Sequence, residues 1–292
     1  MSLPASLDTV LDIRQALASF IQEDVGTGDI TSNTTVPADR NAKAEIVCKT
    51  GNAVVCGLEE AGIIFEMCGC SARALVRDGS RASKGKRVMI IEGNARAILK
   101  AERVALNLIM RMSGIATETR ALADKAKPVK IAATRKTAPG LRYFDKKAVV
   151  IGRGLAHRMR LDDMVLIKDN HIALAGGEPD KCVRLAREGA GTAIKVECEA
   201  KSEKEAIVAI RAGADIVMLD NFTPAQAAKT IRNLAKLGLR KKTIIEISGG
   251  VNHKNIKQYA KAKPDYVSMG YITHSPKAVD FSLEIMTAKT KS

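Results

Sequence analysis

Six short apolar stretches of the chain each end in residues that could do chemistry. They are KIAATRK, MVLIKDNH, IKVECE, DIVMLDN, TIIEISGG and DYVSMG, with apolar cores that begin near residues 131, 164, 194, 216, 244 and 266. Four of these ends carry charged side chains and two carry small residues. If the stretches are parallel strands, their carboxyl ends meet at one edge of a sheet, where a polar site can form.

Cations dominate the segment around the first of these ends. Nine Lys and Arg residues fall within residues 130–160, against a single acid. Arg135, Lys136 and Arg158, with His157, lie beside turns or strand ends. Arg can hold a carboxylate through two parallel hydrogen bonds, whereas Lys supplies a point charge. We therefore expect a substrate with two or more carboxylates, or with carboxylates and phosphates.

Two carboxylates, Glu199 and Asp220, end successive stretches and are expected to lie side by side. Such a pair beside a phosphate suits Mg²⁺, which binds one or two carboxylates together with substrate phosphates. Ion pairs with nearby Lys and Arg are an equally open interpretation. Glu197 lies two residues before Glu199, on the same face of a strand, and the pattern does not rank the two.

Small residues end the two late stretches, as Ser248-Gly249-Gly250 and Met269-Gly270. Late strands of βα barrels often bind a phosphate on main-chain N–H groups, and glycine lets the main chain come close. A pair of tight turns would use the same residues. Both interpretations stay open on spacing alone.

Lys168 and the histidines offer other chemistry. Lys168 follows the apolar MVLI, and a lysine in an apolar setting can form a Schiff base with a carbonyl substrate. His157 and His171 could act in catalysis, although a single histidine more often makes a structural hydrogen bond. An aldolase-type barrel is therefore an alternative.

The elements that would position these residues fall into two parts. After Pro128, strands and helix-length segments alternate at about 22 to 33 residues, which is typical of βα units and, without a dinucleotide fingerprint, of a barrel. Residues 8–24 have helical spacing, and Gly-punctuated strands in the first hundred residues indicate an α+β domain. The amphipathic pattern from Ala95 predicts a long helix, and the closing AVDFSLEIMTAK predicts another.

Composition bounds the class of protein. The 292 residues are 46% hydrophobic, with no apolar run near the roughly 18 residues that a membrane span needs. The N-terminus lacks a signal layout and the six cysteines have no zinc spacing, so we expect a soluble cytoplasmic protein with reduced thiols. The net charge of +15 attracts either nucleic acid or small polyanions.

A nucleic-acid-binding protein is the alternative of a different class. It would bind RNA or DNA with an affinity that falls steeply with salt. Aromatic residues are only 3% of the chain, with no Trp, so the stacking platforms of single-strand binders are scarce.

Longer motifs connect these residues to a known family. The chain contains EDVGTGDITS (23–32), ERVALNLIMRMSGIAT (102–117), TRKTAPGLR (134–142), GLAHRMRLDDMVLIKDNHI (154–172), KVECE (195–199), IVMLDN (216–221), EISGGV (246–251) and SMGYITHS (268–275). In this order, over nearly the whole chain, they resemble quinolinate phosphoribosyltransferase, the nicotinate-nucleotide pyrophosphorylase (carboxylating) family.

The resemblance implies a fold and a reaction. The α/β fold would have an N-terminal α+β open sandwich over residues 1–114, completed by 275–292, and an incomplete, TIM-like seven-stranded α/β barrel over 115–274. The reaction would join quinolinate to phosphoribosyl pyrophosphate with Mg²⁺, giving nicotinate mononucleotide, carbon dioxide and pyrophosphate for de novo NAD synthesis. The enzyme would be a homodimer or a higher oligomer and would bind neither nucleic acid nor membrane.

The resemblance also implies roles for residues. Arg103 would reach the neighbouring subunit's site, and the quinolinate carboxylates and nearby phosphate oxygens would be held by Thr134, Arg135, Lys136, His157, Arg158 and Lys168. Glu199 and Asp220 would face the ribose and hold Mg²⁺. The 5′-phosphate would lie against Ser248, Gly249, Gly250, Met269, Gly270 and Tyr271. The implied catalytic set is Lys136, Lys168, Glu199 and Asp220.

The chain departs from the family pattern at three positions. Arg153 stands where Gly is common, Ala138 where Thr is frequent, and Tyr271 where a smaller residue is usual. Only Tyr271 touches an expected binding loop. A molybdenum-associated paralogue shares the fold and several motifs, but the complete run from Lys168 to His171 together with both acids favours quinolinate chemistry.

Overall fold

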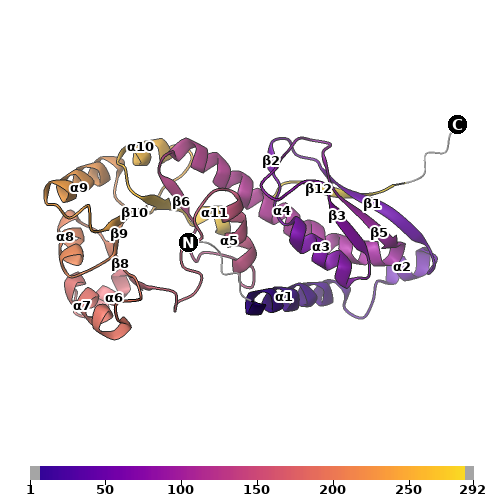
Figure 1. The fold of residues 1–292 in the computed structure, drawn as a ribbon, viewed down its shortest axis with the longest axis horizontal. Helices are drawn as coiled ribbons and strands as arrows, with labels where there is room; N and C mark the ends of the chain where they lie inside the picture. Colours follow the sequence, from indigo (N-terminus) through magenta and orange to yellow (C-terminus); the bar gives the residue numbers. More distant parts are fainter. Residues whose placement is uncertain (1–6, 287–292) are drawn as a thin grey trace. The chain divides into compact units, whose positions relative to one another are not determined.

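The computed structural model of the chain describes residues 7–286, which fall into two compact units. Within the described range, the first unit contains residues 7–120, 138–152 and 275–286. The second unit contains residues 121–137 and 153–274. Figure 1 shows an antiparallel sheet with helices in the first unit and alternating strands and helices in the second.

An antiparallel sheet of order β12-β1-β5-β3 forms the first unit, together with a pair of short strands. The strands are β1 (Asn41–Cys48), β2 (Ala53–Val54), β3 (Ser71–Ala74), β4 (Arg81–Ala82), β5 (Arg87–Asn94) and β12 (Phe281–Ile285). The helices are α1 (Leu7–Val25), α2 (Ile30–Thr35), α3 (Leu58–Met67), α4 (Ala95–Ala126), whose last residues belong to the second unit, and α5 (Arg142–Ile151). The helices expected over residues 8–24 and from Ala95 are thus both present.

Helix α5 is held in the first unit by charged side chains. Asp145 is fully buried, and its carboxylate accepts hydrogen bonds from Arg111 Nε and Nη2 at 2.7 and 2.9 Å. Lys147 Nζ donates to the buried Glu60 at 2.7 Å, and the ring of Phe144 lies 5.8 Å from that of Phe20. A buried charge is stable only when it is paired, so these contacts fix the helix to the N-terminal unit.

A parallel sheet of order β6-β11-β10-β9-β8-β7 forms the second unit. Its strands are β6 (Lys130–Ala132), β7 (Val165–Ile167), β8 (Val196–Ala200), β9 (Ile216–Asp220), β10 (Ile244–Ser248) and β11 (Tyr266–Ser268). The helices are α6 (Asp169–Leu174), α7 (Pro179–Ala190), α8 (Glu203–Arg211), α9 (Pro224–Lys236), α10 (Ile256–Lys261) and α11 (Tyr271–His274). Helices α6 to α10 lie outside the strands (Figure 1).

Local sequence explains where the helices after the central strands begin. Thr223 and Gln226 cap α9 reciprocally, and Pro224 occupies its first turn. Ser202 caps α8 by accepting from the Glu205 N–H. These capping residues and the proline at the helix start stop the strand segments and start helices within a few residues, which leaves the strand ends exposed at one edge of the sheet.

The six strands expected from the sequence are all present, and the seventh barrel position is held by Leu155 alone. Its N–H donates to the Ile131 carbonyl at 2.8 Å and its carbonyl accepts from Ala133 at 2.9 Å. Arg153 and His157, on either side, have φ values of 72° and 54°. Left-handed residues cannot continue a strand, so this segment stays a single bridge.

Two further expectations differ from the structure. The stretch AVDFSLEIMTAK was expected to be helical, which is wrong: Phe281–Ile285 is β12, antiparallel to β1, and residues 287–289 lie outside the described range. Phe, Leu and Ile alternate within FSLEI, which fits the period of a strand. The division of the chain also differs from the expected one, because residues 138–152 belong to the N-terminal unit and the boundary at 114 lies inside α4.

Gly114→Ala is expected to destabilise the protein by at least about 1–3 kcal/mol, the usual cost of overpacking. A Cβ at residue 114 would lie 2.2 Å from the Lys277 carbonyl oxygen, so the backbone that leads to β12 must shift. Gly62→Ala is the matched control, since it is also in a helix and its Cβ meets nothing within 4 Å. Urea unfolding measures both, and equal stabilities of the two variants would contradict this packing.

Candidate active site

The carboxyl ends of the parallel strands surround one cleft of about 600 Å³. Because all six strands run in the same direction, their last residues converge on this edge. The expected residues that line the cleft are Thr134, Arg135, Lys136, His157, Arg158, Lys168, Glu199, Asp220, Ser248, Gly249 and Gly250. Segments separated by more than a hundred residues thus form one site within the second unit.

Two arginines form the cationic part of the cleft. Arg158 is 6% exposed, and burial followed by the charge of Arg135 lowers the pKa of its guanidinium. Arg135 Nε is a buried nitrogen with no hydrogen-bond partner among the described residues. Two like charges held together, one with an unused donor, are a chemical arrangement suited to an anion.

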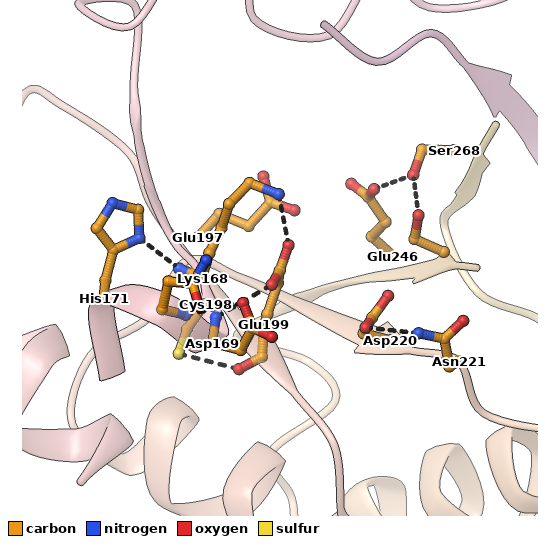
Figure 2. Close-up of polar contacts among 12 residues, drawn as sticks. Lys168, Asp169, His171, Glu197, Cys198, Glu199, Asp220, Asn221, Glu246 and Ser268 are labelled. Carbon is orange, nitrogen blue, oxygen red and sulfur yellow. Dashed lines mark hydrogen bonds and ion pairs between the residues drawn. The ribbon is translucent and has the colours of Figure 1, made fainter. Parts of the chain in front are cut away.

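Lys168 is fixed at the start of α6 by its neighbours (Figure 2). Its Nζ lies 2.8 Å from Glu199 Oε1, and its N–H donates to His171 Nδ1 at 2.9 Å. The side chain is 46% exposed. An exposed, ion-paired lysine does not have the apolar environment that a Schiff-base lysine requires, and His171 serves here as a helix cap.

Glu199 and Asp220 end adjacent strands, β8 and β9, as expected. Burial and then the negative charge of Glu199 raise the pKa of Asp220, whose Oδ2 accepts from Asn221 at 2.8 Å. Two neighbouring carboxylates that destabilise each other are relieved by a divalent cation, and their oxygens are ligands that Mg²⁺ prefers. The donor set therefore fits Mg²⁺.

Glycines let loops approach one another at two places around the cleft. Gly249 has φ +90°, and a Cβ there would lie 2.2 Å from Asn221 Oδ1. At Gly270 a Cβ would lie 2.7 Å from Lys136 Cδ. The first glycine is required where the loops after β9 and β10 meet, because a Cβ would also lie 2.9 Å from the Asn221 backbone nitrogen. The second makes room for the stem of Lys136.

Some expected residues do not line the cleft. Met269 is 3% exposed, and its N–H donates to the Ala132 carbonyl. Gly270 lies against the Lys136 side chain, and Tyr271 begins α11. Arg103 lies on α4 in the first unit, with its side chain 59% exposed. Its expected role in a neighbouring subunit stays a prediction.

The cleft also contains polar residues that the expected set omitted: Asp169, Asn221, Glu246 and Ser268. Asp169 and Asn221 directly follow strand-end residues that were identified. Glu246 stands within the apolar stretch TIIEIS. An acid inside a buried strand needs a partner, so this position could have indicated from the sequence that Glu246 belongs to the site.

The structure separates Glu197 from Glu199, which the pattern could not rank. Glu197 is fully buried beneath the cleft, 3.2 Å from His157 Nε2, whereas Glu199 lines the cleft. Burial and the charge of Glu246 raise the pKa of Glu197 to about 8. His157 also borders a second, mostly apolar cavity of about 370 Å³ at the amino ends of the strands. Glu197 thus lies between the cleft and this second cavity, which we call the lower cavity.

Family models match both parts of the chain. The model described as quinolinate phosphoribosyl transferase, N-terminal domain, matches residues 29–113, and that of the C-terminal domain matches residues 115–284.

Curated relatives and solved structures agree with these matches. A probable nicotinate-nucleotide pyrophosphorylase (carboxylating) of Methanothermobacter thermautotrophicus is 44% identical over 277 residues, 94% of this chain and 99% of the relative. One with the same name from Bacillus subtilis is 38% identical over 282 residues, 94% of each. The structure of the nicotinate-nucleotide pyrophosphorylase from Francisella tularensis has a TM-score of 0.88 at 33% identity and covers 98% of both chains.

Glu197→Gln is expected to change how stability depends on pH. The folded protein keeps the Glu197 proton up to about pH 8, whereas the unfolded chain loses it near 4.5. The stability from this group is therefore full below the unfolded pKa and is lost as pH rises through the folded one. Denaturant unfolding from pH 5 to 9 should show wild type losing up to a few kcal/mol relative to the variant; a flat or rising difference would contradict the assignment.

Proposed function

The chain belongs to the quinolinate phosphoribosyltransferase family, and we propose that it joins quinolinate to phosphoribosyl pyrophosphate and releases carbon dioxide and pyrophosphate. The product is nicotinate mononucleotide, the pyridine nucleotide of de novo NAD synthesis. The family match and the names of relatives at 44% and 38% identity support this reaction.

One observation carries the proposal: an arginine pair and a carboxylate pair line the same cleft. Arg135 and Arg158 provide adjacent guanidinium groups, which suits the two neighbouring carboxylates of quinolinate. Glu199 and Asp220 lie in the same cleft and suit the ribose and pyrophosphate of the second substrate. The site thus has separate places for an aromatic dianion and for an activated sugar phosphate.

The first step forms the bond between the pyridine nitrogen and the anomeric carbon of ribose as the bond to pyrophosphate breaks. Positive charge develops on the sugar, and the carboxylates of Glu199 and Asp220 stabilise it. Lys136 and Lys168 supply positive charge to the substrate carboxylates and to phosphate oxygens. Thr134 Oγ1 accepts the Lys136 N–H at 3.1 Å and shapes the turn that presents Lys136.

The second step breaks the bond between ring carbon 2 and its carboxylate. As carbon dioxide leaves, the electron pair of this bond stays on ring carbon 2 as a carbanion, which the adjacent positively charged nitrogen stabilises, and the carbon then takes up a proton. Arg135, His157 and Arg158 hold the ring in place for this step, so positioning and electrostatics supply the catalysis.

Glu199 and Asp220 would hold Mg²⁺, because their oxygens fit its preferences and their mutual repulsion favours a cation. When bound, the ion neutralises charge on the pyrophosphate. The main chain at Ser248, Gly249 and Gly250 would receive the 5′-phosphate, with Met269, Gly270 and Tyr271 shaping the adjacent turn.

We further propose a homodimer or higher oligomer in the cytoplasm, in which Arg103 reaches the neighbouring site. The exposed position of the Arg103 side chain on α4 supports a contact with a neighbouring subunit. The six cysteines are unpaired, which suits a reducing compartment. Among the described residues, no helix is long and apolar enough to cross a membrane.

Arg135→Ala is expected to lower kcat/KM for quinolinate by at least about tenfold, since a charge-assisted hydrogen bond contributes roughly 1.5–3 kcal/mol. Release of labelled carbon dioxide from quinolinate measures it. The control is Arg160→Ala, because Arg160 is 73% exposed and paired only on the surface with Asp162. A folded wild-type protein that forms no nicotinate mononucleotide would refute the proposed function.

Activity is expected to disappear with a chelator and return with Mg²⁺. Asp220→Asn removes one charged ligand, so the Mg²⁺ concentration for half-maximal rate should rise by about tenfold or more. Asp162→Asn, an exposed acid outside the cleft, is the control and should leave that concentration unchanged. Full activity in the chelator would exclude a role for the ion.

A further inference from the structure

A layer of buried polar side chains lies beneath the cleft, and the reaction described above uses only part of it. We call His157, Glu197, Glu246 and Ser268 the buried polar layer. Glu197 and Glu246 are 0% exposed and Ser268 is 2% exposed. A carboxylate removed from water is stable only with hydrogen bonds to its oxygens, so the partners of Glu246 decide what this layer does.

One oxygen of Glu246 faces His157. The Arg158 N–H donates to His157 Nδ1 at 2.8 Å, so this nitrogen carries no proton. The ring proton is therefore on Nε2, which donates to Glu246 Oε2 at 3.2 Å. His157 has φ +54°, a strained conformation that persists only where surrounding contacts enforce it. Glu246 and the Arg158 amide supply two of those contacts.

This arrangement argues against a metal ion in the buried polar layer. His157, Glu197 and Glu246 have ligand atoms within 4.8 Å of one another, and both oxygens of Glu197 lack a hydrogen-bond partner of good geometry. A metal-bound imidazole, however, donates its other N–H to an acceptor. Here the other nitrogen of His157 accepts from a backbone amide, so Nε2 keeps its proton.

The second oxygen of Glu246 faces Ser268. The Ser268 hydroxyl donates to Glu246 Oε1 (Figure 2) and also lies 3.0 Å from Ser248 Oγ in a second hydrogen bond. Ser268 has one proton, which Glu246 receives, so the Ser248 hydroxyl donates in the second bond. Ser248 begins the Ser248-Gly249-Gly250 loop of the cleft.

We propose that Glu246 is a positioning residue that holds both ends of the cleft: His157 and Arg158 at the carboxylate-binding end through Oε2, and Ser268 and Ser248 at the phosphate-binding end through Oε1. This inference rests on the proposed function. Glu246 links the Leu155–Arg158 segment, β10 and β11, so the distance between the two substrate sites is set by one side chain.

The proposal needs both oxygens of residue 246 to accept hydrogen bonds. Glutamine has the same shape but only one accepting oxygen, and its NH₂ group would face either the His157 N–H or the Ser268 hydroxyl. Glu246→Gln therefore breaks the hydrogen bond at one end of the cleft and changes the orientation of the side chains at the other end. Ser268→Ala removes the hydroxyl that links Glu246 Oε1 to Ser248. It leaves the contact between Glu246 Oε2 and His157 in place.

The test measures KM for each substrate and kcat. Glu246→Gln should raise KM for both quinolinate and phosphoribosyl pyrophosphate by at least about fivefold, with a smaller change in kcat. Ser268→Ala should raise KM for phosphoribosyl pyrophosphate by a similar factor and leave that for quinolinate within about twofold. Thr243→Val is the control, since its buried hydroxyl lacks a partner and lies just before β10; it should change neither KM.

Several results would overturn the inference. A Glu246→Gln protein with both KM values unchanged, or with only a lower melting temperature, would show a purely structural carboxylate. If that variant does not fold, Ser268→Ala tests the inference instead. An equal rise in both KM values, or no rise in either, would contradict separate roles of the two Glu246 oxygens at the two ends of the cleft. Wild-type activity is measured in the same assay, so an inactive wild type would refute the proposed function instead.

Discussion

A carboxylate removed from water needs hydrogen bonds or a cation, and this requirement determines which side chains surround Glu246 in the second unit. Glu246, a fully buried residue of β10, accepts hydrogen bonds from His157 on one side and Ser268 on the other. Burial alone would raise the pKa of Glu246, but hydrogen bonds that include those from His157 and Ser268 oppose this effect, and the pKa is lowered. The polar layer it forms separates a charged cleft from an apolar cavity.

Charge above this layer is divided by sign. Arg135 and Arg158 are held together at one part of the cleft although their charges repel, and Glu199 and Asp220 face each other at another. Keeping like charges together destabilises the free protein and favours ligands of opposite charge, which is how binding sites select ionic substrates. In the proposed reaction, a dicarboxylate beside a sugar phosphate with a divalent cation would satisfy both pairs at once.

Much of the fold and of the site could be predicted from strand ends. The six strands follow from apolar runs that stop at charged or small residues, and parallel pairing brings those ends together whatever their distance in the chain. The sequence could not show which acids face the cleft, because Glu197 and Glu199 share one face and differ only in depth. The hydrogen bond between Glu246 and Ser268 also could not be predicted, because it depends on the pairing of β10 with β11.

The errors have the same origin in contacts between distant segments. Phe281–Ile285 was expected to be helical because the partner that makes it a strand, β1, lies more than 200 residues away. Residues 138–152 join the first unit through Arg111 and Glu60, whose pairing leaves no local pattern. The seventh strand is reduced to Leu155 by left-handed residues on both sides, which the resemblance could not foresee.

The central claim is that quinolinate binds above the buried polar layer with its carboxylates on the arginine pair. A crystal structure with quinolinate and a non-reacting analogue of phosphoribosyl pyrophosphate tests it most directly. The account predicts both ring carboxylates within hydrogen-bond distance of Arg135 and Arg158, with the Arg135 Nε engaged. Quinolinate in the lower cavity beside Tyr266, or in the cleft with both guanidinium groups unengaged, would contradict it.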